Sequence, residues 1–430
     1  MVRTRFAPSP TGFLHIGSLR TALYAYVMAK HNNGQFILRV EDTDQKREVA
    51  GATEALKNTL KLFGLNWDEY YLESERLDIY QKAAKKLVTD NNAFYCQCPP
   101  RNAKTDGFSQ ILRDPCRDKK LDSGAVKLKV PEGEQVKYMD FVHKKEISWD
   151  TGGVYDATLL KSDGFPTYHL AAMVDDLDMK ITHILRGHDW MPSTPIHLLV
   201  FKYLGGICPE IGHLSDILNA QTGKKLSKRR DSVFVEKFLE EGYLPEALLN
   251  FVMLLGWAPK DNRELYTLSE FVQEFDINGF QESNPRFEDN KLKWFNGHYL
   301  RQKSDEELIN LIDFPDKSKL KQILPLIKDR LVTLKDFDQL TNFFFVAPSV
   351  SSDPSISVDH LRFAIDNYDK LVKGELIEEI KAKGWKVGDF FMSLRIAICG
   401  TRSTPPITET MLILGKDEVI LRFKNYLIKN

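Results

Sequence analysis

Two short segments of this chain carry the residue types that nucleotide chemistry uses. The first spans residues 5–17 and reads RFAPSPTGFLHIG, and helix-spaced apolar residues follow it as far as Asn33. His15 and Gly17 are therefore expected at a helix N-terminus, where unpaired backbone N–H groups and the helix dipole attract phosphate. Gly17 also lacks a side chain that would keep a purine or a ribose away. A turn rich in proline and glycine with one surface histidine has the same composition, so this segment alone leaves both interpretations open.

The second segment, GKKLSKRR at residues 223–230, places a group of basic side chains on a predicted loop. A basic loop alone is usually a solvated surface, but its order relative to the first segment favours a functional interpretation. HIGS at residues 15–18 and KLSK at residues 225–228 resemble the HIGH-type and KMSKS-type signatures of class I aminoacyl-tRNA synthetases. The resemblance predicts that the two segments fold together around one ATP molecule.

Further blocks narrow the resemblance. RVEDTD at residues 39–44 and GFPTYHLA at residues 164–171, together with residues 5–17, resemble bacterial-type glutamyl-tRNA synthetases, and the similarity runs nearly end to end. It implies a ligase that uses ATP and Mg²⁺ to form glutamyl-AMP and transfers the glutamyl group to tRNA-Glu, with tRNA-Gln left open as a second substrate. It also implies the catalytic residues His15, Lys225 and Lys228, and the ATP-binding residues His15, Gly17, Trp190, Lys225 and Lys228.

The predicted strand at residues 35–40 delivers Glu41 to its carboxyl end, the edge where open α/β sheets bind ligands. A carboxylate after a strand is often only a turn former, but the resemblance implies that Glu41 pairs with the substrate's ammonium group. Arg5 and Arg186 end two other predicted strands, and two planar donor forks suit a ligand with two carboxylates, as glutamate has. Surface ion pairing is the alternative for either arginine alone. The glutamate site implied by the resemblance consists of Arg5, Ala7, Ser9, Glu41, Tyr168 and Arg186.

The sequence departs from the family pattern near this site. Ala172 stands where the family usually has an asparagine. The loss of one amide near a bound carboxylate is expected to weaken glutamate binding by about 1 kcal/mol. His188 and Asp189 stand where two acidic residues are usual. The reaction needs no general base, so we expect His188 to be a satisfied or exposed histidine and the enzyme to stay active.

Three of the five cysteines lie close together in the sequence: Cys96, Cys98 and Cys116. Tetrahedral zinc needs four ligands, and no histidine lies between the second and third of these cysteines or just after. The fourth ligand would have to be Asp118, which stands where the CxC…CxH site of some family members has its histidine, or a distant residue. A zinc site is one interpretation, and reduced thiols without a metal are the other.

From about residue 304 the chain is dominated by helix-spaced apolar residues with polar joints, which predicts an all-helical region. In the family this region binds the anticodon. SLRIA at residues 393–397 and STPP at residues 403–406 resemble the element that contacts it. The resemblance therefore implies tRNA contacts at Arg395 and Thr404, with a helix-surface charge as the alternative for Arg395.

Length and composition permit this organisation. The chain has 430 residues and a formal net charge of −1, so nucleic-acid binding would depend on local basic patches and not on the overall charge. The N-terminus has no apolar leader, and no apolar run approaches the roughly 18 residues of a membrane span. These features predict a cytoplasmic protein with no membrane partner, and nothing in the pattern indicates more than a monomer.

We expect an α/β fold in which a Rossmann-type nucleotide-binding domain carries an inserted α+β acceptor-binding domain and precedes an all-α anticodon-binding region. The expected domains are residues 1–80 and 161–210 (catalytic), 81–160 (insertion), 211–303 (KLSK loop and stem contact) and 304–430 (anticodon binding). Two other functions stay open. A truncated paralogue that modifies tRNA-Asp with glutamate shares the front half but lacks the C-terminal region. A tRNA-binding protein without catalysis would keep the charge pattern and lose active-site groups.

Overall fold

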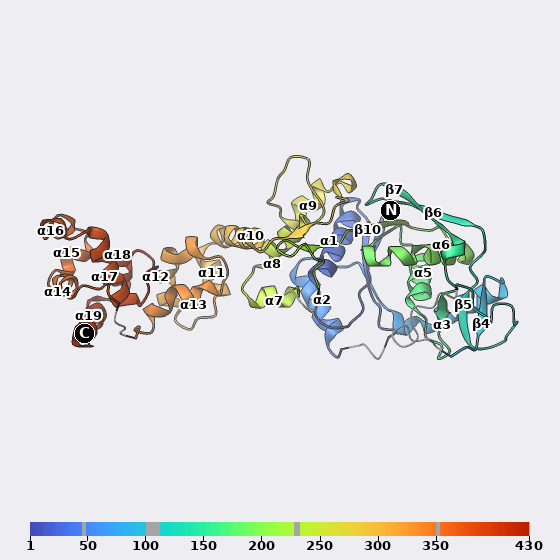
Figure 1. Cartoon of the computed structure of the whole chain (residues 1–430), viewed down its shortest axis with the longest axis horizontal. Helices are drawn as coiled ribbons and strands as arrows, with labels where there is room; N and C mark the ends of the chain where they lie inside the picture. Colours follow the sequence, from blue (N-terminus) through green and yellow to red (C-terminus); the bar gives the residue numbers. More distant parts are fainter. Residues whose placement is uncertain (45–48, 100–111, 228–232, 350–352, 430) are drawn as a thin grey trace. The chain divides into compact units, whose positions relative to one another are not determined.

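The structure of this protein is a computed structural model that describes residues 1–44, 49–99, 112–227, 233–349 and 353–429. It divides into two compact units. The first consists of Met1–Leu239 and Leu248–Asp289, and the second of Glu240–Ala247 and Asn290–Asn430. The strands of the described residues all belong to the first unit, whereas the second is built from helices, as Figure 1 shows.

A parallel sheet forms the centre of the first unit. Its strands are β1 (Arg3–Phe6), β2 (Gln35–Val40), β3 (Glu69–Leu72), β9 (His183–Gly187) and β10 (Glu210–Leu214). β1 pairs with β2, β2 with β3 and β9 with β10, all in parallel. β1 and β9 come together where the Thr182 N–H donates to the Arg3 carbonyl oxygen at 2.9 Å. The strand order β3-β2-β1-β9-β10 confirms the predicted Rossmann-type fold.

Helices connect these strands. They are α1 (Ile16–His31), α2 (Ala52–Leu62), α3 (Leu77–Thr89), α5 (Tyr168–Asp178) and α6 (Thr194–Leu204). α1 links β1 to β2, and its residues Leu19, Leu23 and Val27 are fully buried. It ends where Asn33 adopts a left-handed φ of 52° and the Gly34 N–H donates to the carbonyl oxygen of Ala29. α1 therefore starts directly after the loop that follows β1, which places its N-terminus at the carboxyl edge of the sheet.

An insertion separates α3 from α5. Its antiparallel sheet has the order β4-β5-β8, formed by β4 (Ala93–Cys96), β5 (Ala125–Leu128) and β8 (Thr158–Leu160). A hairpin of β6 (Gln135–Asp140) and β7 (Lys145–Asp150) follows a different course, because β6 runs parallel to β10 with Asp140 opposite Ile211. The hairpin thus extends the catalytic sheet, which the alternating pattern at residues 124–150 does not reveal.

Short elements follow β10 along the sequence: β11 (Leu218–Asn219), α7 (Val235–Glu240), α8 (Pro245–Met253), α9 (Leu268–Glu274) and β12 (Arg286–Phe287). β11 and β12 pair in parallel. Aromatic rings join α9 to α1, with the Tyr24 ring 5.2 Å from that of Phe280 and 6.5 Å from that of Phe271. This packing fixes the segment after the KLSK motif to the helix that begins at His15.

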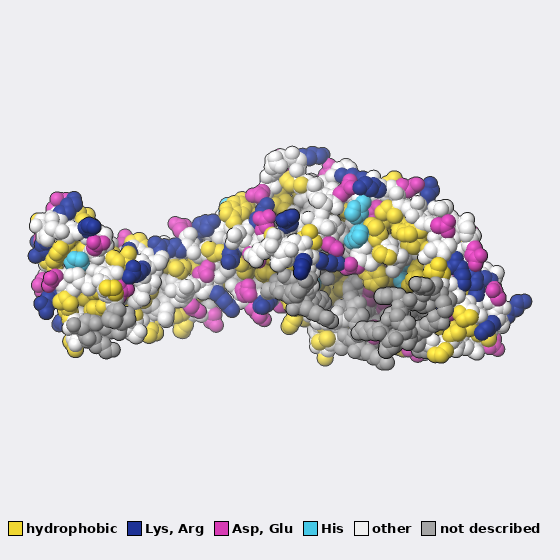
Figure 2. Space-filling view, viewed as in Figure 1, with side chains coloured by type: hydrophobic (Ala, Val, Ile, Leu, Met, Phe, Trp, Pro, Cys, Tyr) yellow, Lys and Arg dark blue, Asp and Glu magenta, His cyan; other side chains and the backbone are white. Residues whose placement is uncertain are grey.

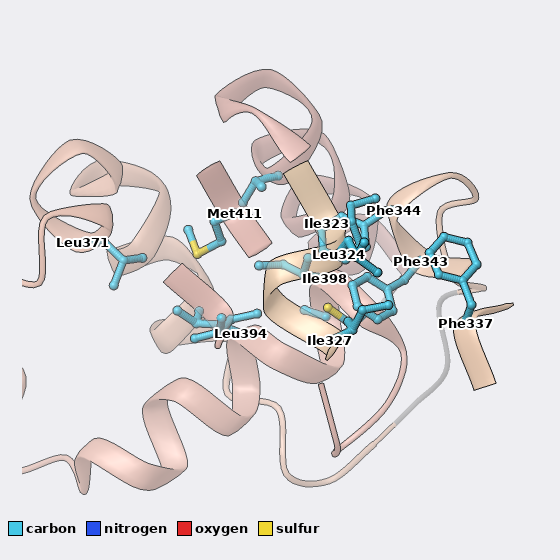
Figure 3. Close-up of a cluster of buried hydrophobic side chains, with 14 of the residues drawn as sticks. Ile323, Leu324, Ile327, Phe337, Phe343, Phe344, Leu371, Leu394, Ile398 and Met411 are labelled. Carbon is cyan, nitrogen blue, oxygen red and sulfur yellow. The ribbon is translucent and has the colours of Figure 1, made fainter. Parts of the chain in front are cut away.

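The second unit packs its helices around an apolar core. The helices are α10 (Asp289–Gln302), α11 (Asp305–Leu311), α12 (Lys317–Ile327), α13 (Asp336–Thr341), α14 (Val358–Asp366), α15 (Tyr368–Val372), α16 (Ile377–Ala382), α17 (Val387–Cys399), α18 (Ile407–Leu414) and α19 (Lys416–Lys429). Figure 3 shows Leu324, Phe344, Leu394 and Met411 in the cluster that joins them, and all four are buried. The predicted helical C-terminal region is confirmed.

Basic and acidic side chains are intermixed over the face of the molecule drawn in Figure 2, in keeping with the net charge of −1. The described residues on this face therefore form no large area of one charge sign that would by itself mark a nucleic-acid surface. No helix in the described part of the chain is both long and apolar enough to cross a membrane.

Candidate active site

A cavity of about 310 Å³ lies at the carboxyl ends of β1, β2 and β9. Its lining includes all six residues of the expected glutamate site and two of the expected ATP-binding residues: Arg5, Ala7, Ser9, Glu41, Tyr168 and Arg186, with His15 and Trp190. Gly17 and Lys225 do not line this cavity, and Lys228 lies outside the described residues. The three residues expected at strand ends, Arg5, Glu41 and Arg186, thus line one cavity, and glutamate binding there stays a prediction.

His15 is the N-cap of α1, and its ring is held by the first turn of the helix. Its backbone is extended, and its Nδ1 accepts a hydrogen bond from the Gly17 N–H at 2.9 Å. The proton of the neutral ring is therefore on Nε2. A Cβ atom on Gly17 would lie 3.2 Å from His15 Nδ1, so the glycine also leaves room for this ring position. The residue predicted to make space for a nucleotide makes space for His15.

The chain after the KLSK motif pairs with the His15 segment. The Ile16 N–H donates to the Val233 carbonyl oxygen, and the Val235 N–H donates to the Leu14 carbonyl oxygen, both at 2.9 Å. Within the motif itself, the Leu226 N–H donates to the Ile217 carbonyl oxygen at 2.9 Å. These bonds bring the two segments that resemble HIGH and KMSKS to neighbouring positions, as the sequence predicts.

Lys225 is held by two carboxylates at the end of β9 and after β10. Its Nζ lies 2.6 Å from Asp189 Oδ1 and 2.9 Å from Asp216 Oδ1. Partial burial works against the charge, but the hydrogen bonds to Asp189 and Asp216 raise the pKa of Lys225. Lys225 is therefore a cation, and Asp189 of the unusual pair His188-Asp189 is one of its partners.

Glu41 is a cavity carboxylate that the protein neutralises only in part. Its Oε1 lies 3.4 Å from Arg39 Nη2. Arg39 also forms an ion pair with Asp176, whose Oδ1 lies 2.7 Å from Nη1. Burial raises the pKa of Glu41 to about 7, and the charges of Arg39 and Arg5 offset this effect incompletely. A cation of a bound ligand would stabilise the ionised form of this carboxylate, and the ammonium group of an amino acid is such a cation.

The two cavity arginines have different surroundings. Arg5 and Arg186 are 3% and 4% exposed. Arg5 Nε donates to Asp176 Oδ1 at 3.1 Å, so a carboxylate balances its charge, whereas the polar neighbours of Arg186 are histidine and threonine side chains. Next to them the ring centroids of Tyr168 and Trp190 lie 4.0 Å apart and form an apolar wall of the cavity.

The departures from the family pattern lie outside the cavity lining. Ala172 is fully buried in the apolar core around α5 and α6. The ring of His188 lies 6.0 Å from that of His143 and does not line the cavity. The effect of Ala172 on glutamate binding stays a prediction.

Several buried polar residues of the site were not predicted from the sequence: Arg39, Asp140, Asp176, Thr194, His197 and His213. Arg39 belongs to the RVEDTD block and Asp176 follows the GFPTYHLA block, yet nothing in the sequence indicated that they meet. One sequence feature pointed to His213, because it is an ionisable residue next to the carboxyl end of strand β10. A polar residue at that edge of a parallel sheet commonly serves a site.

The cysteine segment forms a compact cluster with an unexpected fourth member. Ligand atoms of Cys96, Cys98, Cys116 and Asp114 all lie within 4.8 Å of one another, and Asp118 is not part of this cluster. The Sγ atoms of Cys98 and Cys116 are 3.4 Å apart. Three sulfurs and one carboxylate at this spacing fit a four-coordinate zinc ion. Asp114 also receives Lys127 Nζ at 2.5 Å, a cation that would share the carboxylate with a metal.

Arg395 and Thr404 contact each other on the second unit. Arg395 Nε donates to Thr404 Oγ1 at 2.9 Å, and Thr404 is 4% exposed. The Thr404 hydroxyl therefore holds the arginine and is not itself presented to solvent. The predicted tRNA contact at Arg395 stays a prediction.

Comparison with known proteins agrees with this architecture. Residues 1–294 match the family "tRNA synthetases class I (E and Q), catalytic domain", and residues 292–427 match "Anticodon binding domain". The glutamate–tRNA ligases of Alkaliphilus metalliredigens and Clostridioides difficile are 35% and 36% identical to this chain, each over 98% of both chains.

Solved structures give the same result. A glutamate tRNA ligase of Elizabethkingia meningosepticum in complex with its amino acid and a glutamate-tRNA synthetase of Elizabethkingia anophelis each match with a TM-score of 0.88. Both are 32% identical to this chain and cover 99% of each chain. With the paired HIGS and KLSK segments at one sheet edge and matches over its full length, this chain belongs to the glutamate–tRNA ligase family of class I tRNA synthetases.

Proposed function

We propose that the protein is a glutamate–tRNA ligase, which activates L-glutamate with ATP as glutamyl-AMP and transfers the glutamyl group to the 3′ end of tRNA-Glu. The observation that carries this proposal is the cavity lined by Glu41, Arg5 and Arg186 next to His15. One carboxylate and two guanidinium groups match an amino acid with one ammonium and two carboxylate groups. The α-carboxylate of glutamate attacks the α-phosphate of ATP, and pyrophosphate leaves.

Negative charge grows on the phosphate oxygens in this step. His15 at the helix N-terminus, Lys225 and Lys228 would supply hydrogen bonds and positive charge that strengthen as the charge develops. Because Lys225 is bound to Asp189 and Asp216, ATP phosphates would have to compete with these carboxylates for it. Trp190 and Gly17 complete the proposed ATP site.

Magnesium is proposed as a partner of the nucleotide. Mg²⁺ commonly keeps several waters and binds substrate phosphates in place of a protein cage. Among the described residues that line the cavity, Glu41 is the one carboxylate, which fits an ion carried by ATP better than one held by the protein. Bound in this way, Mg²⁺ would neutralise phosphate charge.

A charging assay tests the enzyme proposal. The purified protein should attach glutamate to tRNA-Glu, and Lys228→Ala should slow charging at least ~100-fold, by analogy with the removal of one preorganised donor at an oxyanion. A protein that binds tRNA-Glu and charges none would favour the tRNA-binding alternative. The match of residues 292–427 to an anticodon binding domain argues against the truncated paralogue.

Glutamate activation is expected to depend on tRNA, as the family resemblance implies. ATP–pyrophosphate exchange with glutamate should appear only when tRNA-Glu is added. Exchange without tRNA would contradict this expectation. Charging of tRNA-Gln in parallel decides whether the enzyme also uses that tRNA.

The two parts of the chain outside the catalytic sheet are proposed to bind the tRNA. The insertion around β4, β5 and β8 would receive the acceptor end, and the helical unit would contact the anticodon through Arg395, by the stacking and polar contacts that single-stranded RNA allows. We further propose that the protein acts as a monomer in the cytoplasm. Light scattering of the purified protein tests the first of these points.

A structural zinc ion is proposed at Cys96, Cys98 and Cys116, with Asp114 as the fourth ligand. Metal analysis of the purified protein should find about one equivalent of zinc, as one four-coordinate site requires. A content below a few tenths of an equivalent would retire the zinc proposal and leave the reduced-thiol interpretation.

A further inference from the structure

Of the two arginines that line the cavity, Arg186 is the one whose side-chain partners are all uncharged. Its Nε donates to His213 Nε2 at 3.0 Å, and its Nη2 donates to Thr194 Oγ1 at 2.8 Å. Its Nη1 lies 2.8 Å from His197 Nδ1. No carboxylate within the described ranges forms an ion pair with it, whereas Arg5 has a carboxylate at 3.1 Å.

Asp140 explains how His213 can accept this hydrogen bond. Its Oδ2 lies 2.7 Å from His213 Nδ1, and Oδ1 accepts two backbone N–H groups of the following turn, at 3.0 Å each. Burial alone would raise the pKa of Asp140, but these hydrogen bonds lower it. The ionised Asp140 carboxylate therefore accepts the His213 Nδ1–H, and its Oδ2 also accepts the Tyr138 hydroxyl at 2.8 Å. The neutral ring then presents the lone pair of Nε2 to Arg186.

His197 and His169 form the same kind of chain on the other side of the guanidinium. Because Nδ1 of His197 accepts from Arg186, the ring proton is on Nε2, which lies 3.0 Å from His169 Nδ1. Burial, assisted by the charge of Arg186, lowers the pKa of His169 to about 4 and that of His197 well below its usual range. Burial likewise lowers the pKa of His213 to about 4. All three rings are neutral at physiological pH.

We propose that Asp140 and His213 are positioning residues that fix the Arg186 guanidinium and leave its positive charge for the side-chain carboxylate of the substrate. This inference rests on the proposed function. His213 and His197 hold two nitrogens of the guanidinium in place through neutral acceptors, so the plane is fixed without a protein anion. A substrate carboxylate completes the ion pair.

The arrangement selects a charged side chain over its amide. A buried guanidinium without a carboxylate partner is costly, and a bound carboxylate removes that cost. Glutamine would offer a neutral amide to the same group and leave the charge unbalanced. If the same arginine were paired with a protein carboxylate, as Arg5 is, this preference would be weaker.

The substitution Asp140→Asn tests the proposal without creating a cavity. The amide oxygen can keep the two backbone N–H groups, and the amide NH₂ then faces His213 Nδ1. His213 Nδ1 then accepts a hydrogen bond from the amide, and the ring proton moves to Nε2. There the proton points at the Arg186 Nε–H, and the hydrogen bond between His213 and Arg186 is lost. We expect the KM for glutamate to rise at least ~10-fold, as for loss of a hydrogen bond to a charged group. The KM for ATP and the thermal unfolding temperature should change little.

Histidine ¹⁵N spectra report which ring nitrogen carries the proton. This position would not change if Asp140 only stabilised the fold. His213 should carry its proton on Nδ1 in the native protein and on Nε2 in Asp140→Asn. A second pair of variants checks the acceptor directly. His213→Leu should raise the KM for glutamate, whereas His213→Gln, whose amide oxygen can reach the Nε2 position, should restore most of the loss.

Glu210→Gln is the matched control, because Glu210 and His183 form another acid–histidine pair on β9 and β10, 3.6 Å apart, without contact to Arg186. It should leave the KM for glutamate unchanged. A folded Asp140→Asn variant with the KM for glutamate or the His213 tautomer of the native protein would overturn the proposal. Native protein that charges no tRNA with glutamate would instead contradict the proposed function, while the ¹⁵N spectra would still decide the tautomers.

Discussion

The two units of the protein treat charge in opposite ways. The catalytic unit buries charged side chains around one cavity, among them Arg5, Arg39, Glu73, Asp140, Asp175, Asp176 and Arg186. In the described part of the helical unit, Arg422 is the one buried residue among its Asp, Glu, Lys and Arg side chains, and the core consists of apolar residues. Because buried charge is costly unless it is paired, its concentration at one sheet edge indicates a site for a charged ligand. The helical unit keeps its charges at the surface, where a nucleic-acid backbone can reach them.

Removal of the central cation of the catalytic unit should have the largest effect. Arg39 is fully buried and lies 2.7 Å from Asp176 Oδ1, 3.4 Å from Glu41 Oε1 and 3.8 Å from a carboxylate oxygen of Glu73. Arg39→Met removes the cation beside Glu41 and Glu73 and leaves Asp176 with Arg5 alone, so the free energy of unfolding should fall by about 3–5 kcal/mol. Urea denaturation measures this loss.

The buried arginine of the helical unit provides the comparison. Arg422 donates to the carbonyl oxygens of Phe343 and Ile398 and pairs with Glu418, which is partly exposed. Arg422→Met leaves no buried carboxylate without a cation, so the free energy of unfolding should fall by only about 1–3 kcal/mol. Equal losses in the two variants would contradict the contrast between the units.

Glu41→Gln should weaken glutamate binding next most strongly. The substitution keeps the shape of the side chain and removes the negative charge that faces the substrate's ammonium group. The KM for glutamate should rise about 10- to 100-fold, the loss of one charge-assisted hydrogen bond, while the KM for ATP stays close to its native value. Glu54→Gln is the control, because the Glu54 side chain on α2 is 71% exposed. It should change neither the KM for glutamate nor the KM for ATP.

The pH dependence of glutamate binding should report the same residue. The pKa of Glu41 is raised by burial to about 7, and the ammonium ligand requires the ionised form. Affinity for glutamate should therefore be full above this pKa and fall as pH decreases through it, approaching about tenfold per pH unit. The KM for glutamate, measured from about pH 6 to 8.5, should lose this dependence in Glu41→Gln. A flat native profile would show that Glu41 does not control binding.

The smallest effect is expected in the helical unit. Arg395→Ala should raise the KM for tRNA-Glu by about two- to tenfold, the loss of one surface contact, and leave the KM values for glutamate and ATP unchanged. Thr404→Val removes the hydroxyl that holds Arg395 and keeps the cation. If Thr404→Val reproduces the whole effect, the contribution of Arg395 is to its own unit and not to tRNA.

Local features of the site could be predicted from the sequence, and long-range ones could not. His15 follows from helix-start signals, and Arg5, Glu41 and Arg186 meet because parallel strands end at one edge. The contact between Asp140 and His213 spans 73 positions and depends on the pairing of β6 with β10, which no local pattern specifies.

Two predictions for residues on turns and loops differ from the structure. The fourth member of the cysteine cluster is Asp114, two positions before Cys116, whereas alignment with a family motif indicated Asp118. Thr404 was predicted as a surface contact and is buried, because the direction of a side chain on a loop depends on what packs against it. Arg395, on a regular helix, lies where the helical pattern placed it.

The pairing of β6 with β10 has a consequence for engineering this enzyme. The segment between β5 and β8 resembles an independent module that could be replaced as a whole, since β5 and β8 are neighbours in the small antiparallel sheet. A graft that replaced the whole segment would also delete Asp140, and with it the carboxylate behind His213. A replacement of this segment therefore has to keep Asp140 in β6, or His213 loses its carboxylate partner.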